Sequence, residues 1–361
     1  MKLQQDQGAF MQFGMNFLSL VFTAIIAVFS IQVKAERWNA MNSPSIMADD
    51  FVYHLDALPT KGSLDVQPWA ETYWASKKGS INLRWNQERP VGFKTESPTR
   101  AQAARMTHEE LARLAPSEKY DLLMGRYHYP LKQEVEGIAT PMAKWWSGLC
   151  DGWSLAALQY AEPQPVELAN PDGILVPFGA SDIKGLMSYA AARRFNVSTH
   201  QVGGRCSGVG RILSTPGCQD INAGSLHVIF SNMIGLRKKG FVTEIDPGNQ
   251  IWNQPTFAYE YEITGSAKPD AGATGVRVHA RLFYADELDQ SSWQPVVGTE
   301  KNAFDKLEMD YILDLDLAGR IIGGRYVGGQ RPDFVWLPIN RLEFKDDLDG
   351  INQLIQNNQT H

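Results

Sequence analysis

The sequence has little of what marks a nucleic-acid-binding, metal-binding or disulfide-rich protein. Only three of its 361 residues are cysteines, and 34 basic residues stand against 40 acidic ones, for a net charge of -6. The longest basic run is the tripeptide at 237–239. Because proteins that bind nucleic acids neutralise phosphates with a basic face, this balance argues against a nucleic acid partner and favours a small molecule or a protein.

Short motifs of several enzyme classes are also missing. The chain contains no HExxH, CxxC or G-x-S-x-G, and the glycines between 203 and 210 do not follow a strand-to-helix phosphate pattern. No cluster of side chains has the spacing of metal ligands, so we predict neither a metal nor any other cofactor. Hydrophobic residues make up 43% of the chain and charged residues 20%, which is typical of a globular protein and excludes the disordered class.

The N-terminus has the pattern of an export signal. Residues 17–33 are almost unbroken apolar sequence, and small residues precede a polar start at Glu36. We expect a signal peptide over 1–35, with cleavage after Ala35. The alternative is an uncleaved anchor, because the apolar run reaches the lower edge of a membrane span. No later stretch has that length, so we expect a secreted or periplasmic protein without stable membrane association after cleavage.

Export changes how the cysteines are interpreted, because thiols tend to pair outside the cytoplasm. Cys206 and Cys218 lie in a loop rich in Gly, Pro and Ser that can bring them together. A disulfide there would stabilise the fold by roughly 3 kcal/mol through chain entropy. Cys150 is then the unpaired thiol, and it is either a reactive group or a buried structural cysteine.

The pattern of the chain predicts an α+β fold in successive regions. Residues 36–140 favour short strands and loops plus one helix, which begins near Pro116 and closes at Gly125. Residues 141–263 carry helices and then strands around the unpaired thiol. The stretch 264–275 lacks apolar residues and is expected to be a linker or exposed loop. Residues 276–361 alternate with period two, which predicts a β-rich C-terminal portion.

Cys150 is placed by its neighbours in the first turn of a helix that follows Gly148. A helix N-terminus lowers the pKa of a thiol through its unpaired N–H dipoles, and an imidazole would complete an ion pair. A second helix is expected to begin with a cap at Ser181. The segments 225–234 and 240–248 flank a short basic loop and predict a β-hairpin.

This hairpin singles out His227 among the histidines. If the turn lies at 236–237, the register puts Asp246 directly across from His227, and cross-strand pairs are about 4.5–5.5 Å apart at Cβ. The carboxylate would then orient the imidazole, as in a catalytic triad. The alternative for Asp246 is a turn residue, because it begins an Asp-Pro-Gly sequence. Trp146 could donate its indole N–H to an oxyanion, although core packing explains it equally well.

Several blocks of the chain together resemble the transglutaminase elicitor family of secreted oomycete and bacterial proteins. The blocks are PWAETYW (68–74), LAPSEKYDLLMG (114–125), WWSGLCDGWSLAAL (145–158), VPFGASDIKGL (176–186), DINAGSLHVIFSNMIG (220–235), FVTEIDPGNQIWNQP (241–255) and GRIIGGRYVGGQRPDFVWLP (319–338). They run in order through most of the mature chain, which makes the set specific.

The resemblance implies a papain-like thiol core that takes an acyl group from glutamine and passes it to a lysine amine. Its partners would be proteins or peptides bearing glutamine and lysine. By motif the nucleophile falls on Cys150, the base on His227 and the orienting acid on Asp246. The chain has fewer cysteines than oomycete members, so their disulfide requirement is not carried over. Its export signal is of a bacterial type, so their role in eliciting plant defence is not carried over either. A cysteine peptidase or glutamine deamidase on this scaffold, or a non-catalytic surface binding module, remain the alternatives.

Overall fold

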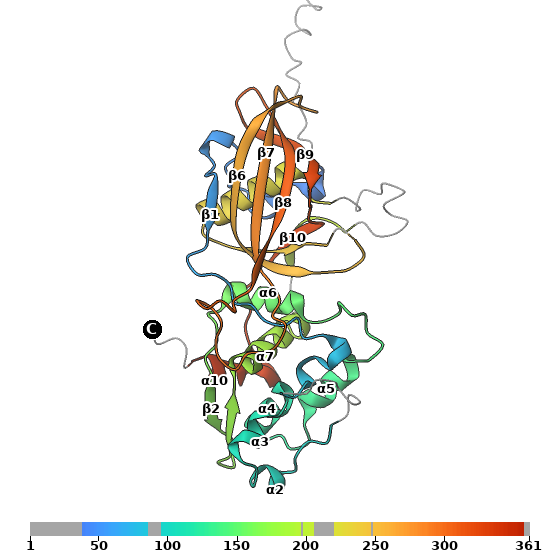
Figure 1. The fold of residues 1–361 in the computed structure, drawn as a ribbon, viewed down its shortest axis with the longest axis vertical. Helices are drawn as coiled ribbons and strands as arrows, with labels where there is room; N and C mark the ends of the chain where they lie inside the picture. The colour runs from blue at the N-terminus through green and yellow to red at the C-terminus, as the bar shows by residue number, and fades with distance from the viewer. Residues whose placement is uncertain (1–37, 86–94, 196–197, 206–219, 247, 357–361) are drawn as a thin grey trace, which may run out of the picture. The chain divides into compact units, whose positions relative to one another are not determined.

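In the computed structural model, an antiparallel sheet and a group of helices form the unit Arg37–His361 (Figure 1). The described stretches are 38–85, 95–195, 198–205, 220–246 and 248–356. The export signal expected at 1–35 and the disulfide expected between Cys206 and Cys218 lie outside these stretches, and both stay predictions. In the described part of the chain, no helix is long and apolar enough to cross a membrane.

The largest element is an antiparallel sheet. Its strands follow the order β4-β10-β5-β6-β7-β8-β9, and β1 pairs with β6 outside this path. The bounds are β1 Lys61–Ser63, β4 Thr199–Gly203, β5 Phe241–Glu244, β6 Asn253–Ala267, β7 Thr274–Ala285, β8 Phe304–Leu315, β9 Ile321–Gly329 and β10 Phe334–Pro338. Buried positions alternate with more exposed ones along much of β7, so the sheet packs one face on a core.

Outside this sheet the described chain contains helices, loops and a small strand pair. The α-helices are α2 Arg100–Ala103, α3 His108–Ala112, α4 Pro116–Leu123, α5 Pro130–Ile138, α6 Cys150–Gln159, α7 Ala180–Arg193, α9 Ala223–Phe230 and α10 Ile351–Gln356. The short 3-10 helices are η1 Ala40–Asn42, η2 Pro44–Ile46, η3 Leu55–Ala57, η4 Ser76–Lys78, η5 Ser80–Asn82 and η7 Asp346–Leu348, and η6 Ser231–Leu236 is a π-helix. A small antiparallel pair, β2 Val166–Ala169 and β3 Leu175–Phe178, lies beside these helices.

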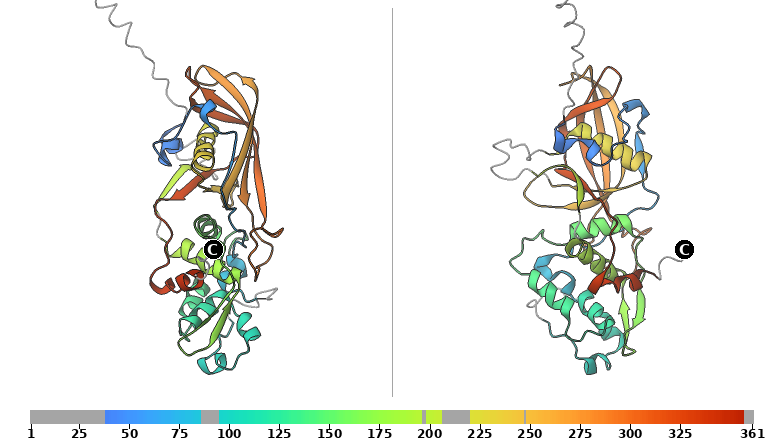
Figure 2. Two further views of the ribbon diagram at one scale, coloured as in Figure 1. Left: turned by 90° about the vertical axis from the view of Figure 1, so that its left-hand side faces the viewer. Right: turned by 180° about the vertical axis from the view of Figure 1, so that it is seen from behind.

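The apolar side chains gather in two cores. One core is helical and includes Trp69, Tyr120 and Trp153. The other lies between the sheet and α9, where Phe230 contacts Tyr259, and Figure 2 shows α9 in yellow covering that face of the sheet. Helix α6 packs on α7 and also contacts β6. The chain around α6 therefore joins the helical core to the sheet.

The hairpin expected from 225–234 and 240–248 is wrong. Residues 223–236 are helical, first as α9 and then as the π-helix, and only Phe241–Glu244 forms a strand, which pairs with β6 and β10. Asn222 caps the helix by accepting from the backbone N–H groups of Gly224 and Ser225. A continuous apolar run fits a buried helix as well as a buried strand, so periodicity does not separate the two.

The stretch 264–275 is not a linker, but its middle, 268–273, is the loop that joins β6 to β7, which fits the exposed-loop alternative. Strand β6 continues to Ala267 and β7 begins at Thr274, and the two strands pair up to Ala267 opposite Gly275. The β-rich C-terminal portion accordingly shares one sheet with β5 and β6. Gly, Ala and Pro weaken a strand pattern without preventing strand pairing when both neighbours supply a register.

The expectation of one helix in residues 36–140 is wrong, because the described residues of this region form α2, α3, α4 and α5. Other expectations at this level hold in part. The fold combines helices and sheet, and α4 begins at Pro116 and ends just before Gly125. The cap expected at Ser181 is wrong, because α7 begins at Ala180 with Gly179 at the cap position, and the hydroxyl of Ser181 donates to Glu71 instead. Pro at the first helical position and Gly just beyond the end are strong local signals, which explains why the bounds of α4 were predictable. The papain-like arrangement of the core stays a prediction.

Candidate active site

Cys150 is the first residue of α6, as the sequence predicts. The helix start is fixed by Tyr73, whose carbonyl oxygen accepts a hydrogen bond from the backbone N–H of Leu149 at 2.7 Å. A Cβ added to Gly148 would lie 2.1 Å from the same oxygen. Only glycine permits this close approach of the two backbones, and the approach sets where the thiol projects.

The sulfur of Cys150 faces the beginning of β6. Its Sγ lies 3.8 Å from the carbonyl oxygen of Ile251, to which the thiol donates, and 4.0 Å from Nδ2 of Asn253. The hydroxyl of Ser154 lies 2.7 Å from the carbonyl oxygens of both Cys150 and Asn253. These contacts hold the first turn of α6 against the strand, and the side chain of Cys150 is only 6% exposed.

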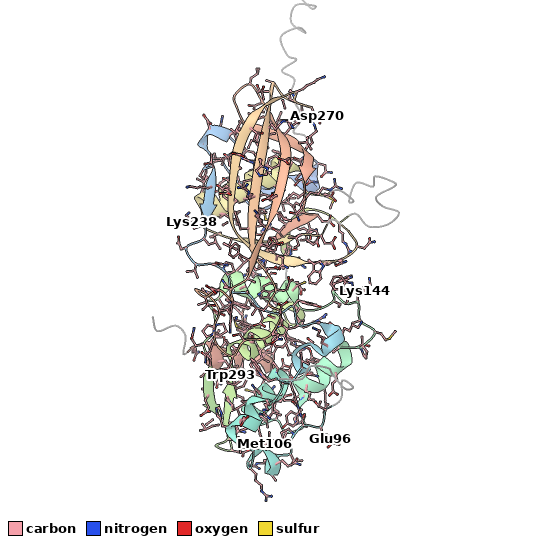
Figure 3. The ribbon with its side chains drawn as sticks, viewed as in Figure 1. Glu96, Met106, Lys144, Lys238, Asp270 and Trp293 are labelled. Atoms are coloured by element: carbon pink, nitrogen blue, oxygen red, sulfur yellow. The ribbon has the colours of Figure 1, made fainter. Side chains whose placement is uncertain are left out.

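Aromatic side chains lie beside this contact. The ring of Trp252 is 5.2 Å from the ring of Tyr73 and 5.5 Å from that of Trp145, measured between centroids. The Tyr73 hydroxyl donates to the backbone oxygen of Trp145 at 2.8 Å. The ring of Trp146 lies 5.0 Å from Nζ of Lys144, which Figure 3 labels just ahead of α6. The predicted role of Trp146 in an oxyanion hole stays a prediction.

The electrostatics of the thiol differ from the sequence-based expectation. The pKa of Cys150 is raised to about 12, first by burial and then by the charge of Asp151, while the N–H groups of Asn253 act in the opposite direction. A helix N-terminus favours the thiolate, but loss of hydration disfavours the charged form more strongly at a fully buried position. The thiol of Cys150 is therefore neutral in this arrangement.

His227 lies in α9, fully buried in the core beneath the sheet. Its Nδ1 is 2.7 Å from the hydroxyl of Tyr311, and its ring lies 4.5 Å from that of Tyr261. Among the described residues, Nε2 has no hydrogen-bond partner. Burial lowers the pKa of His227 to about 3. The imidazole is therefore neutral and surrounded by aromatic rings.

The structure does not bring His227 to Cys150. The imidazole contacts Tyr261, whereas the sulfur contacts Asn253 at the start of the same strand. Tyr261 lies eight residues farther along β6, and at about 3.3 Å per residue that separation is roughly 26 Å. The catalytic role assigned to His227 stays a prediction, but its expected position on a strand beside the thiol is wrong.

Asp246 follows β5 and forms a turn. Its Oδ1 accepts from the backbone N–H of Gly248 at 2.5 Å, and its own N–H lies 3.3 Å from Oε1 of Glu244. That oxygen of Glu244 also accepts from the N–H of Trp252 at 2.9 Å, so Glu244 anchors the loop that leads into β6. Burial raises the pKa of Glu244 to about 8. The contacts of Asp246 match the turn-former alternative.

Sequence reasoning missed the residues that contact the thiol. Asn253 lies in the block 241–255, and its Oδ1 accepts from Nε1 of Trp336 at 2.9 Å. The local signal for this residue is its polar side chain directly after Trp252 and two residues before Pro255. In the described part of the chain, no group of three or more His, Cys, Asp or Glu side chains could hold a metal ion.

Comparison with known proteins adds two findings. The family model for the transglutaminase elicitor matches residues 131–276, which include Cys150 and Asn253. The fold is similar to the crystal structure of the GP42 transglutaminase from Phytophthora sojae, with a TM-score of 0.64 and 20% sequence identity over 85% of this chain and 93% of that chain. No curated protein matched the chain.

Proposed function

We propose that this chain, whose residues 131–276 match the family model of the transglutaminase elicitor and whose fold is similar to that of the GP42 transglutaminase, is a transglutaminase that uses Cys150 as its nucleophile. The donor is a glutamine side chain and the acceptor is a lysine amine. The observation that carries the proposal is the position of Cys150, which starts α6 inside the matched segment with its sulfur facing the backbone of β6.

The reaction is acyl transfer in two halves. The sulfur attacks the γ-carboxamide carbon, a C–S bond forms, the C–N bond breaks, and the thiol proton leaves with ammonia. The lysine amine then attacks the thioester, the C–S bond breaks, and a proton of the amine returns to the sulfur. The product is an isopeptide bond, and no oxidant or reductant takes part. His227 as base and Asp246 as its orienting acid stay predictions from the sequence.

The surroundings of the thiol favour transfer over hydrolysis. Cys150 is 6% exposed. The ring of Trp252 contacts the rings of Tyr73 and Trp145, and the residues on either side of Trp252 contact the sulfur. A site with little water protects a thioester until an amine arrives. Water in place of the amine would give deamidation, and attack on a peptide carbonyl would give proteolysis, so exclusion of water decides between outcomes.

The test is incorporation of a fluorescent primary amine into a protein that bears accessible glutamines. We expect incorporation by the wild-type protein and none by Cys150→Ala. Ser188→Ala is the matched control, because it removes a buried polar group of similar size that donates to the backbone oxygen of Lys184. Incorporation that persists in Cys150→Ala would overturn the proposal. Ammonia release without incorporation would indicate a deamidase instead.

A further inference from the structure

We propose that Asn253 is a catalytic residue whose side-chain N–H stabilises the thiolate of Cys150, and that Trp336 is the positioning residue that aims this amide. The inference rests on the proposed acyl transfer. It stands on a chain of contacts from β10 through β6 to the first residue of α6.

The polar atoms of the Asn253 side chain each have a partner. Its Oδ1 accepts from the indole Nε1 of Trp336 at 2.9 Å, and its Nδ2 lies 4.0 Å from the sulfur of Cys150. The backbone oxygen of Asn253 accepts from the Ser154 hydroxyl at 2.7 Å. The side chain is only 6% exposed, so solvent has little access to these bonds and the amide is held from both sides.

Trp336 fixes which end of the amide faces the thiol. An indole N–H is a donor only, so the atom of Asn253 that faces Trp336 must be the carbonyl oxygen. The amino end of Asn253 then has to face the sulfur, whichever way the two ends would otherwise be assigned. The thiol proton points elsewhere, toward the oxygen of Ile251 at 3.8 Å. The sulfur thus meets a donor on one side and an acceptor on the other.

This pattern stabilises the reacting state more than the resting one. A neutral thiol is a weak hydrogen-bond acceptor, so the amide gains little from it before reaction. A thiolate accepts a charge-assisted bond that is about twice as strong as a neutral one. An interaction that strengthens as charge develops accelerates the chemical step instead of merely binding substrate. Asn253 therefore lowers the barrier to forming the attacking sulfur.

The experiment compares Asn253→Leu and Trp336→Phe with the wild-type protein. Leucine is close to asparagine in shape and lacks the donor, and phenylalanine keeps the ring of residue 336 without its N–H. The measurements are kcat and KM for amine incorporation and, independently of transferase activity, the rate of iodoacetamide alkylation of Cys150 between pH 7 and 9. Trp85→Phe is the matched control, because it removes an indole N–H that donates to Asp182 at 2.8 Å in the helical core.

We expect Asn253→Leu to lower both kcat and the alkylation rate by roughly 10- to 100-fold, with KM changed less than about 2-fold, since a charge-assisted bond is lost. Trp336→Phe should lower both by a smaller factor, roughly 3- to 10-fold, because the amide remains but is no longer aimed. The double variant should be no slower than Asn253→Leu alone, because the two residues act in one chain. Trp85→Phe should keep both rates.

Folded variants with unchanged alkylation and unchanged kcat would overturn the role of Asn253. A loss that appears in KM alone would overturn it too, because that result describes substrate binding. Additive losses in the double variant would overturn the positioning role of Trp336. If Asn253→Leu does not fold, Trp336→Phe still decides the question. If the wild-type protein shows no amine incorporation, the proposed function fails, and the alkylation rates still test the contact with Cys150.

Discussion

Protonation of His227 should destabilise the protein in mild acid. The imidazole is fully buried, and its Nδ1 forms a hydrogen bond with the hydroxyl of Tyr311 at 2.7 Å. No described residue is a hydrogen-bond partner of Nε2, so one of the two N–H groups of a protonated ring would be buried without an acceptor. Burial alone accounts for the lowered pKa, from 6.5 to about 3. The folded protein therefore resists a proton that the unfolded chain accepts readily.

The sign and size of the effect follow from proton linkage. Between pH 6.5 and about 3 the unfolded state binds a proton at His227 that the folded state does not, so the free energy of unfolding falls as the pH falls through this window. At about 1.4 kcal/mol for each pH unit, the loss reaches roughly 5 kcal/mol at the acid end. Above the window His227 contributes no pH dependence, and below it the loss is constant.

Urea unfolding at pH values from 7 to 4 measures this loss. The variant His227→Gln is uncharged throughout, so its stability relative to the wild-type protein should improve steadily as the pH falls. Phe230→Leu is the matched control, because it weakens the same core without removing a titratable group and should keep the wild-type pH dependence. Parallel profiles for wild-type protein and His227→Gln would refute the buried neutral imidazole. A ring that titrates above neutral pH would instead support the thiol–imidazole ion pair predicted from the sequence.

Three further predictions concern the thiol, a helix crossing and the loop before β6. Cys150 should react with iodoacetamide at pH 7.5 at least about 100-fold more slowly in the native than in the unfolded protein, because burial holds its pKa near 12; equal rates by peptide mass spectrometry would contradict this. Gly152→Ala should lose roughly 3 kcal/mol or more in urea unfolding, since its Cβ would lie 2.0 Å from the backbone oxygen of Ser188, whereas Gly137→Ala, with nothing within 4 Å, should gain up to about 1 kcal/mol. Glu244→Gln should abolish a loss of stability that the wild-type protein shows as the pH rises from 4.5 through about 8, because the buried carboxyl is protonated in the folded state and ionised in the unfolded chain; an unchanged slope would show that Glu244 does not titrate as described.

Local signals were enough to place the starts of α4 and α6. Pro116 stands at the first position of α4, and Gly148 precedes α6 at the point where a backbone oxygen approaches it. These residues restrict the backbone in ways that hold in almost any surroundings. The position of Cys150 in a first helical turn was therefore predictable without knowledge of what the turn contacts.

The assignment of α9 could not be settled in the same way. The stretch at 223–230 is largely apolar and contains the β-branched residues Val228 and Ile229, which favour strands. In the structure every residue of the helix is buried, and a residue that is covered on all sides carries no periodic signal. The register counted across an assumed turn at 236–237 placed Asp246 opposite His227. Because residues 223–236 are helical, this cross-strand pairing does not form.

Contacts at the sulfur depend on residues that are far apart in the sequence. Asn253 is 103 positions from Cys150 and 83 positions from Trp336, and the two strands that carry Asn253 and Trp336 are separated by β5. No spacing rule links a residue at the start of one strand to an indole two strands away. Only the sheet order reveals that the amide has one end committed to a donor and the other facing the thiol.

The high pKa of Cys150 and the exclusion of water around its sulfur have one physical cause, which is burial. The same burial that keeps water from a thioester also raises the pKa of Cys150, so a dry site cannot hold a permanent thiolate by helix position alone. Such a site needs donors that are fixed before the reaction and act only when charge appears. Asn253 meets that requirement because Trp336 and Ser154 immobilise its amide and its carbonyl oxygen. Activation of the thiol then depends on β6 keeping its place against the first turn of α6, which ties the chemistry to the packing of the helical part on the sheet.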